Sequence, residues 1–146
     1  AVAIEASLLL GPGRIVAVEE KTRRVALIQS NARRFGVYNL DVVQARLPEG
    51  MDTLPRPDRI FVGGGGRDLA EILRQAAGRL APGGVMVVNT VLLENLSPAT
   101  EALEASGLAV EVVQIQVNRS KPMPWARRLA AENPVWIVTG KKKEKN

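Results

Sequence analysis

The sequence predicts an α/β fold in which a mostly parallel sheet finishes with an antiparallel strand. Short β-branched runs alternate along the chain with helical patterns, which is typical of a parallel sheet whose strands are connected by helices. These runs are almost continuously apolar, as strands buried on both faces are. Near the carboxyl end, two such runs are joined by a loop without a helix, and this connection favours an antiparallel pair.

Six segments are predicted to be strands and four to be helices. The predicted strands span residues 14–20, 40–44, 59–63, 85–91, 108–120 and 133–140. The predicted helices span residues 1–10, 22–36, 68–84 and 97–107. Together they predict one domain over residues 1–140, followed by a basic tail over residues 141–146.

The helix at 22–36 places its apolar side chains at helical spacing. Val25, Ile28, Ala32 and Phe35 share one stripe, and Gly36 is the residue type that commonly ends a helix. These positions predict an amphipathic helix that stops at Gly36.

The next two helices are bracketed by capping signals. Asp68, with Glu71 three residues later, predicts a helix start, and residues 82–84 (Pro-Gly-Gly) end the same segment. The dipeptide Ser97-Pro98 predicts the start of the last helix, because proline is favoured in the first turn, and Gly107 predicts its end.

The first predicted helix has no strand ahead of it. A doubly wound sheet needs a first strand and a glycine-rich turn before that helix. We therefore expect this strand and its turn to precede Ala1, so that the domain is N-terminally incomplete in this sequence.

The composition excludes several kinds of active site. The 146 residues include no cysteine and no histidine, which removes thiolate nucleophiles, imidazole bases and the usual zinc ligands, so no metal site is expected. No apolar run approaches the ~20 residues of a membrane span, and the first ten residues do not resemble a signal peptide. We expect a cytoplasmic protein without a membrane partner.

The charge suggests anionic partners. The net charge is +5 and the pI is about 10.1. Much of this charge lies in the tail KKKEKN at 141–146, and such runs are usually solvated termini. Aromatic residues make up 3% of the chain, too few for a surface that stacks on bases, so we expect no nucleic-acid partner.

Six stretches in this order resemble one enzyme family. They are IEASLLLGPGRIVAVEE (4–20), RRVALIQSNARRFGVYNLDVV (23–43), PDRIFVGGGG (57–66), LAPGGVMVVNTVLLENL (80–96), VVQIQVNRSKP (112–122) and NPVWIVTGK (133–141). Together they resemble the decarboxylating precorrin-6Y methyltransferases of cobalamin biosynthesis, over nearly the whole chain. The resemblance implies the class I S-adenosylmethionine-dependent methyltransferase fold, a Rossmann-like sheet whose last strand inserts antiparallel.

The resemblance also implies a reaction. A methyl group passes from S-adenosylmethionine to carbon 15 of a precorrin, and carbon dioxide leaves the acetate side chain on ring C. The sulfonium already makes the methyl group a strong electrophile, so the protein must chiefly align donor and acceptor. A chain without histidine or cysteine is compatible with this chemistry, and we assign no catalytic base.

Two acids after the first predicted strand are candidates for cofactor binding. Glu19 matches the family's acid that accepts hydrogen bonds from the ribose hydroxyls, and Glu20 follows it. The alternative is that either residue caps the helix that begins at Thr22.

The next strand departs from the family pattern. Ala45, Arg46 and Leu47 stand where relatives usually have an acid near the adenine. Arg46 cannot accept a hydrogen bond from the adenine amino group, whereas the Leu47 amide and side chain remain able to contact the ring. Structural drift is the alternative explanation for this departure.

Four glycines follow the strand at 59–63. The resemblance places Gly63 and Gly64 beside the donor methyl group, and Gly65 and Gly66 beside the substrate, where missing side chains let a flat macrocycle approach. A phosphate site is disfavoured, because Asp68 opens the next helix and no Lys-Ser/Thr pair is present. The alternative is a flexible turn.

Candidate substrate contacts lie at two further places. Asn89 ends the strand at 85–91, where the alternative is an ordinary polar strand end. Arg119, Lys121 and Arg127 lie in the loop between the last two strands and would pair with precorrin carboxylates, unless they are only exposed loop charges.

The same loop is a candidate oligomer contact. Family members are commonly tetramers, which implies a homo-oligomer here. Met123 and Trp125 would either stack on the macrocycle or pack the loop against a neighbouring subunit.

Three other interpretations stay open. An RNA methyltransferase of the same fold would suit the high pI, although NPVWI lies in the last strand and not where a target-base motif would stand. A nicotinamide dehydrogenase would also place an acid on a ribose, but the antiparallel finish disfavours it. A noncatalytic methyltransferase-like domain would explain why Arg46 stands where relatives usually have an acid near the adenine.

Overall fold

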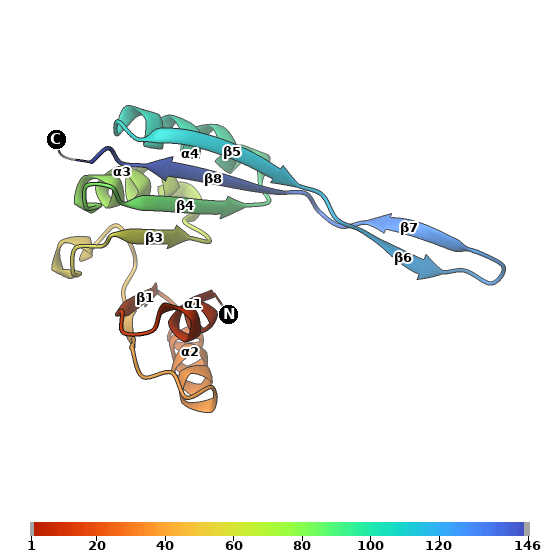
Figure 1. Ribbon diagram of the computed structural model, residues 1–146, viewed down its shortest axis with the longest axis horizontal. Helices are drawn as coiled ribbons and strands as arrows, with labels where there is room; N and C mark the ends of the chain where they lie inside the picture. Colours follow the sequence, from red (N-terminus) through yellow and green to blue (C-terminus); the bar gives the residue numbers. More distant parts are fainter. Residues whose placement is uncertain (1, 145–146) are drawn as a thin grey trace. The chain divides into compact units, whose positions relative to one another are not determined.

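The computed structural model describes residues 2–144 and divides into two compact units, Ala1–Thr53 and Leu54–Asn146 (Figure 1). The first unit contains α1 (Val2–Leu10), β1 (Ile15–Glu19), α2 (Thr22–Arg34), β2 (Leu40–Gln44) and η1 (Met51–Thr53). The second contains β3 (Arg59–Val62), η2 (Gly66–Asp68), α3 (Leu69–Arg79), β4 (Val85–Thr90), α4 (Leu93–Ala105), β5 (Ala109–Ile115), β6 (Asn118–Pro122), β7 (Arg127–Ala131) and β8 (Val135–Lys141). Among the described helices, none is long and apolar enough to cross a membrane.

The first unit is a parallel pair of strands with two helices. β1 and β2 pair in register from Ile15 opposite Leu40 to Glu19 opposite Gln44. Its small core contains Ile4 of α1, Ala32 of α2 and Val37, with Leu40 packed against them. Both strands have the bounds that their apolar runs predict, to within one residue at each end.

Asn39 fixes the turn that leads from α1 into β1. Its side-chain amide donates hydrogen bonds to the carbonyl oxygens of Ser7, Gly11 and Gly13, at 3.3, 3.3 and 3.0 Å. These carbonyls lie at or beyond the end of α1 and lack partners within the helix. One side chain therefore determines where the helix stops and β1 begins.

The second unit contains a mixed sheet in the order β3-β4-β8-β5. β3 and β4 are parallel, while β8 lies between β4 and β5 and is antiparallel to both. The antiparallel finish predicted from the sequence is therefore confirmed, including the insertion of the last strand. The strands and the helices α3 and α4 form two layers (Figure 1).

The core of this unit lies between the sheet and its two helices. α3 buries residues at i, i+3, i+4, i+7 and i+8, the pattern of one apolar stripe. Among residues 2–144, the largest fully buried side chains are Leu73, Leu80, Met86, Leu103, Val88 and Val138. They come from α3, α4, β4, β8 and the turn after α3, so burial joins the helix layer to the sheet layer.

α4 starts earlier than the sequence predicts. Its N-cap is Leu92, so Ser97 is not a cap, and Pro98 lies inside the helix. The prediction assumed proline in the first turn, but the preceding turn already holds the start of the helix through the Thr90 hydroxyl, which accepts a hydrogen bond from the Leu92 amide at 3.1 Å. Ser97 instead donates to Glu101 Oε1 at 2.6 Å.

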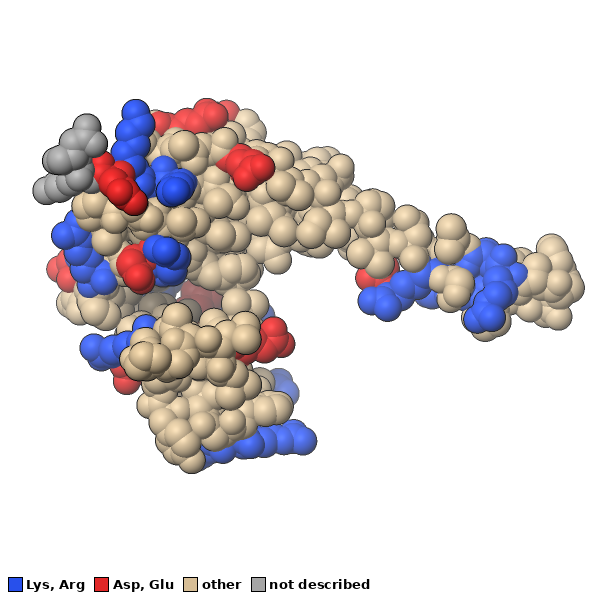
Figure 2. All heavy atoms as spheres, viewed as in Figure 1, with Lys and Arg blue, Asp and Glu red and all other residues tan. Residues whose placement is uncertain are grey.

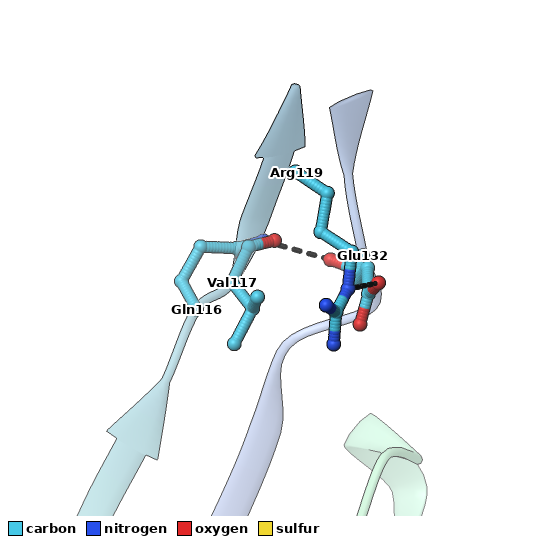
Figure 3. Close-up of polar contacts among 4 residues, drawn as sticks. All are labelled: Gln116, Val117, Arg119 and Glu132. Carbon is cyan, nitrogen blue, oxygen red and sulfur yellow. Dashed lines mark hydrogen bonds and ion pairs between the residues drawn. The ribbon is translucent and has the colours of Figure 1, made fainter. Parts of the chain in front are cut away.

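The predicted strand at 108–120 is two strands, and the loop after it is largely a β-ribbon. β5 stops at Ile115, and β6 and β7 form a separate antiparallel pair with Met123 to Ala126 at its tip. At the break, Gln116 Nε2 donates to the Glu132 carbonyl oxygen at 2.7 Å, and the Glu132 amide donates to Val117 at 2.8 Å (Figure 3).

Two other predicted details differ. Phe35 lies beyond α2 and is exposed, with the Arg34 guanidinium 5.9 Å from its ring centre, so it does not share the buried stripe of Val25 and Ala32. Lys141, which the sequence assigns to the tail, is the last residue of β8 and lies opposite Val85 and Ala109. Residues 145 and 146 of that tail lie outside the described residues.

Candidate active site

The carboxyl ends of β3 and β4 meet at one edge of the four-stranded sheet. Val62 lies opposite Val88 in this parallel pair, so Gly63 and Asn89 come next on neighbouring strands. Open α/β sheets bind their ligands at this edge.

A hollow of about 290 Å³ opens at this edge of the second unit. It is lined by Gly63, Gly64, Gly66, Asn89, Thr90, Val91, Leu92 and Asn95. Four predicted site residues, Gly63, Gly64, Gly66 and Asn89, are therefore brought together. Gly65, which the sequence also assigned to the substrate, does not line the hollow.

Gly64 and Gly65 lack side chains for different reasons. Gly65 has φ 151°, and an added Cβ would lie 2.8 Å from Leu69 Cδ1 and 3.0 Å from its Cα, so the turn into η2 requires glycine there. Gly64 has no positive φ, and an added Cβ would meet nothing within 4 Å. Neither backbone nor packing requires glycine at position 64, and its effect is to keep the hollow open.

Thr90 organises the other wall of the hollow. Its hydroxyl is buried and accepts hydrogen bonds from the Leu92 amide at 3.1 Å and from Asn95 Nδ2 at 3.3 Å. The same hydroxyl contacts the Leu92 carbonyl oxygen at 3.4 Å. The sequence analysis gave no role to Thr90, Val91, Leu92 or Asn95, because α4 was predicted to begin only at Ser97.

Glu19 stands at the carboxyl end of β1 in the first unit. Its side chain is 19% exposed, its Oε1 accepts a hydrogen bond from the Lys21 amide at 3.0 Å, and its Oε2 lies 3.8 Å from an Arg24 guanidinium nitrogen. Lys21 is the N-cap residue of α2, so the Glu19 carboxylate lies beside the start of this helix, although α2 has no side-chain cap hydrogen bond. Each carboxylate oxygen keeps a further lone pair for a hydroxyl donor.

The other predicted residues of this unit follow the two strands. The Ala45 amide donates to the Glu19 carbonyl oxygen at 3.2 Å, which brings Ala45 beside Glu19. Glu20 and Arg46 are exposed, and Leu47 is half-buried.

The predicted substrate cations lie on the β6–β7 ribbon, where Figure 2 shows a cluster of basic side chains. Residues directly opposite one another in an antiparallel pair share a face, so Lys121 shares a face with Arg128, and Arg119 lies two residues along that face. Arg127 is opposite Pro122 and lies on the other face. Arg119 is already ion-paired with Glu132 (Figure 3).

The ribbon separates these cations from Asn89. In the sheet, Thr90 of β4 and Gln114 of β5 are both paired with Trp136 of β8. Lys121 follows Gln114 by seven residues along the chain. At about 3.3 Å per residue, this stretch spans on the order of 20 Å. The structure therefore does not gather the cations of one chain around the hollow of that chain.

Comparison with known proteins identifies the family. The family model described as "Precorrin methyltransferase domain" matches residues 1–142. The chain belongs to this family. A probable cobalt-precorrin-6B C(15)-methyltransferase (decarboxylating) of Pyrobaculum calidifontis is 41% identical over 140 residues, which cover 94% of this chain and 71% of the relative.

Other relatives and solved structures agree. A cobalt-precorrin-6B C(15)-methyltransferase (decarboxylating) of Salmonella typhimurium is 31% identical over 144 residues, covering 98% of this chain and 74% of that protein. The crystal structure of a precorrin-6Y C5,15-methyltransferase from Geobacter metallireducens has a TM-score of 0.88 at 41% identity, covering 97% of this chain and 74% of that one.

A more distant structure shows how widely the fold is used. A SAM-dependent O-methyltransferase of Thermotoga maritima has a TM-score of 0.72 at 17% identity, covering 92% of this chain and 51% of that one. The precorrin methyltransferase family thus shares the predicted methyltransferase fold with enzymes named for other chemistry. Within residues 2–144, no three acidic side chains gather as they would around a metal ion.

Proposed function

We propose that this chain uses S-adenosylmethionine to methylate a precorrin at carbon 15 and that it releases the ring C acetate carboxylate as carbon dioxide, in cobalamin biosynthesis. The observation that carries the proposal is the match of residues 1–142 to the precorrin methyltransferase family, together with relatives named for decarboxylating methylation at C(15). Such an enzyme would work in the cytoplasm.

Residues at the ends of β1 and β2 in the first unit are proposed to hold the methyl donor. Glu19 offers two carboxylate oxygens to vicinal ribose hydroxyls, with Glu20 next to it, and the segment Ala45, Arg46 and Leu47 follows β2 where the adenine is expected. Gly63 and Gly64 leave room that a Cβ at position 64 would fill. When bound, S-adenosylmethionine supplies an electrophilic methyl group, and the chain's task is to align it with the acceptor carbon.

The substrate is proposed to lie at the hollow beside β4. Asn89 is exposed there, and within residues 2–144 its side-chain amide makes no hydrogen bond, so both its donor and its acceptor are open to the macrocycle. Gly66 leaves open space at the same edge, whereas the role of Gly65 is to shape the turn.

The ribbon cations are proposed to act in an oligomer, with a tetramer favoured. Lys121 and Arg127 lie too far along the ribbon to serve a substrate in the hollow of their own chain, as the length of β6 implies. In a homo-oligomer they can pair with the carboxylates of a precorrin held by a neighbouring copy. Arg119 would have to exchange its Glu132 partner for such a contact.

Calorimetric titration with S-adenosylhomocysteine tests the cofactor assignment. Glu19→Gln keeps an acceptor for the Lys21 amide but loses the charge, so affinity should fall about tenfold or more, because charge-assisted hydrogen bonds are roughly twice as strong as neutral ones. Glu104→Gln changes an exposed acid of α4 outside the proposed site, so this control should bind as the wild type does.

A second assay tests the reaction. Incubation with S-adenosylmethionine and the precorrin should give a product that has gained a methyl group and lost carbon dioxide, read by mass spectrometry. A folded chain that binds no S-adenosylhomocysteine would contradict the proposal and favour the noncatalytic interpretation.

A further inference from the structure

The hollow beside β4 carries no charged side chain. Glycine backbone forms one wall, and Val91 and Leu92, each 52% exposed, contribute apolar surface to the other. The charges that adjoin the lining along the chain are Arg67 and Glu94, which have opposite signs and do not line the hollow. A carboxylate placed here would meet no ammonium or guanidinium group among the lining residues.

The polar groups of the lining are mostly engaged with one another. The Thr90 hydroxyl is held by the Leu92 amide, by Asn95 Nδ2 and by the Leu92 carbonyl oxygen. The backbone amide of Asn95 donates a hydrogen bond to the Leu92 carbonyl oxygen at 3.1 Å. These bonds engage Thr90, Leu92 and Asn95, so the open side-chain donor of the lining is the neutral amide of Asn89.

The start of α4 does not restore a positive site. The positive end of a helix attracts anions, but here the first turn carries the Glu94 carboxylate, whose charge offsets that end. The Leu92 amide is also already bonded to Thr90. The lining therefore offers a bound carboxylate a neutral amide and no cation.

We propose that this hollow receives the acetate side chain that is lost as carbon dioxide, and that it promotes decarboxylation by leaving the carboxylate without a cation. The inference rests on the proposed function. Carbon 15 adjoins ring C, so the acetate on that ring lies beside the carbon that is methylated, and both must be accommodated at the same edge of the sheet. Val91 and Leu92 are positioned to contact this side chain.

The step balances without an oxidant or a metal ion. The bond between the acetate methylene and the carboxylate carbon breaks, its electron pair moves into the conjugated C=N system of the macrocycle, and carbon dioxide leaves. The methylene carbon then takes a proton from water and becomes a methyl group. Negative charge leaves the carboxylate as the bond breaks, so a neighbouring cation would stabilise the ground state more than the transition state.

A lysine introduced into the hollow tests the inference. Leu92→Lys should bind the precorrin more tightly but release carbon dioxide about tenfold more slowly, the size of one charge-assisted contact, while methyl transfer continues. The methylated product that retains its carboxylate should accumulate, as read by mass spectrometry, and absorbance titration of the precorrin gives the affinity. Leu93→Lys puts the same charge at an exposed neighbouring position that does not line the hollow, so this control should partition as the wild type does.

Two further variants close the test. Val91→Lys repeats it from the neighbouring position, and wild-type carbon dioxide release in both lysine variants would overturn the inference. Arg67→Gln should keep carbon dioxide release, and its loss with methylation intact would show that a cation drives the step. A wild-type chain that transfers no methyl group to the precorrin would refute the proposed function itself, which is a different observation.

Discussion

Gly64 and Gly65 are neighbours whose missing side chains have different consequences. The conformation of Gly65 and the nearby Leu69 backbone exclude a side chain, whereas position 64 has both an ordinary φ and open space. The sequence grouped the glycines into one ligand-facing set. The tertiary structure shows that Gly65 and Gly66 have positive φ angles in the turn, whereas Gly64 leaves room in the hollow without any such requirement.

Alanine substitutions at these two positions should affect different properties, ligand binding at position 64 and stability at position 65. Gly64→Ala should leave stability unchanged and weaken S-adenosylhomocysteine binding, because its methyl group enters the hollow. Gly65→Ala should lower the free energy of unfolding by about 1–3 kcal/mol, the usual range for a strained backbone residue. Thermal and urea unfolding with calorimetric titration measure both. Undiminished ligand binding by Gly64→Ala would contradict its place in the cofactor site.

At the scale of elements, the C-terminus of α3 is closed by a lysine from the end of the chain. Lys142 Nζ donates to the carbonyl oxygens of Ala77, Gly78 and Leu80 at 2.9, 3.4 and 2.8 Å. A cation at this end also complements the helix dipole. The sequence analysis assigned Lys142 to a solvated tail, because charge runs at a terminus give no signal of such a distant partner.

Removing the ammonium group should destabilise the second unit. Lys142→Met keeps the aliphatic chain but leaves three carbonyls without this donor, so the free energy of unfolding should fall by about 1–2 kcal/mol. Urea denaturation followed by circular dichroism measures the change. Lys143→Met, at an exposed neighbouring position, is the control and should have little effect, and equal losses in both variants would contradict the capping role.

The strands were predicted more accurately than the elements between them. Buried strands appear as dense apolar runs, and β2 and β4 have bounds close to those predicted. The start of α4 was missed because its capping group, the Thr90 hydroxyl, lies in the preceding strand. The β6–β7 ribbon was missed because its exposed residues show no alternation of apolar and polar side chains.

At the scale of the molecule, the β6–β7 ribbon combines apolar exposure with positive charge. Trp125 is 82% exposed and Leu129 is 71% exposed, and the same ribbon carries a cluster of basic side chains (Figure 2). A two-stranded ribbon is only marginally stable by itself. A neighbouring subunit would bury its apolar side chains, which is why the oligomer is proposed to form there.

Changing the ribbon should therefore change the assembly. Trp125→Ser combined with Leu129→Ser should shift the sedimentation of the chain from a tetramer to smaller species, with the far-ultraviolet circular dichroism of the main sheet retained. Tyr38→Ser removes a 95% exposed aromatic side chain from the first unit and is the matched control. A wild-type chain that sediments as a monomer at micromolar concentration would contradict the proposal.

The sequence by itself determined the α/β class, the antiparallel last strand, the glycines after β3 and the family. These features depend on local apolar runs and on motifs that are continuous in the chain. Only the tertiary structure decided that Thr90, Leu92 and Asn95 line the hollow with Gly64, that Lys142 closes α3, and that the ribbon holds its cations away from Asn89. Each of these depends on contacts between residues whose partners no local pattern specifies.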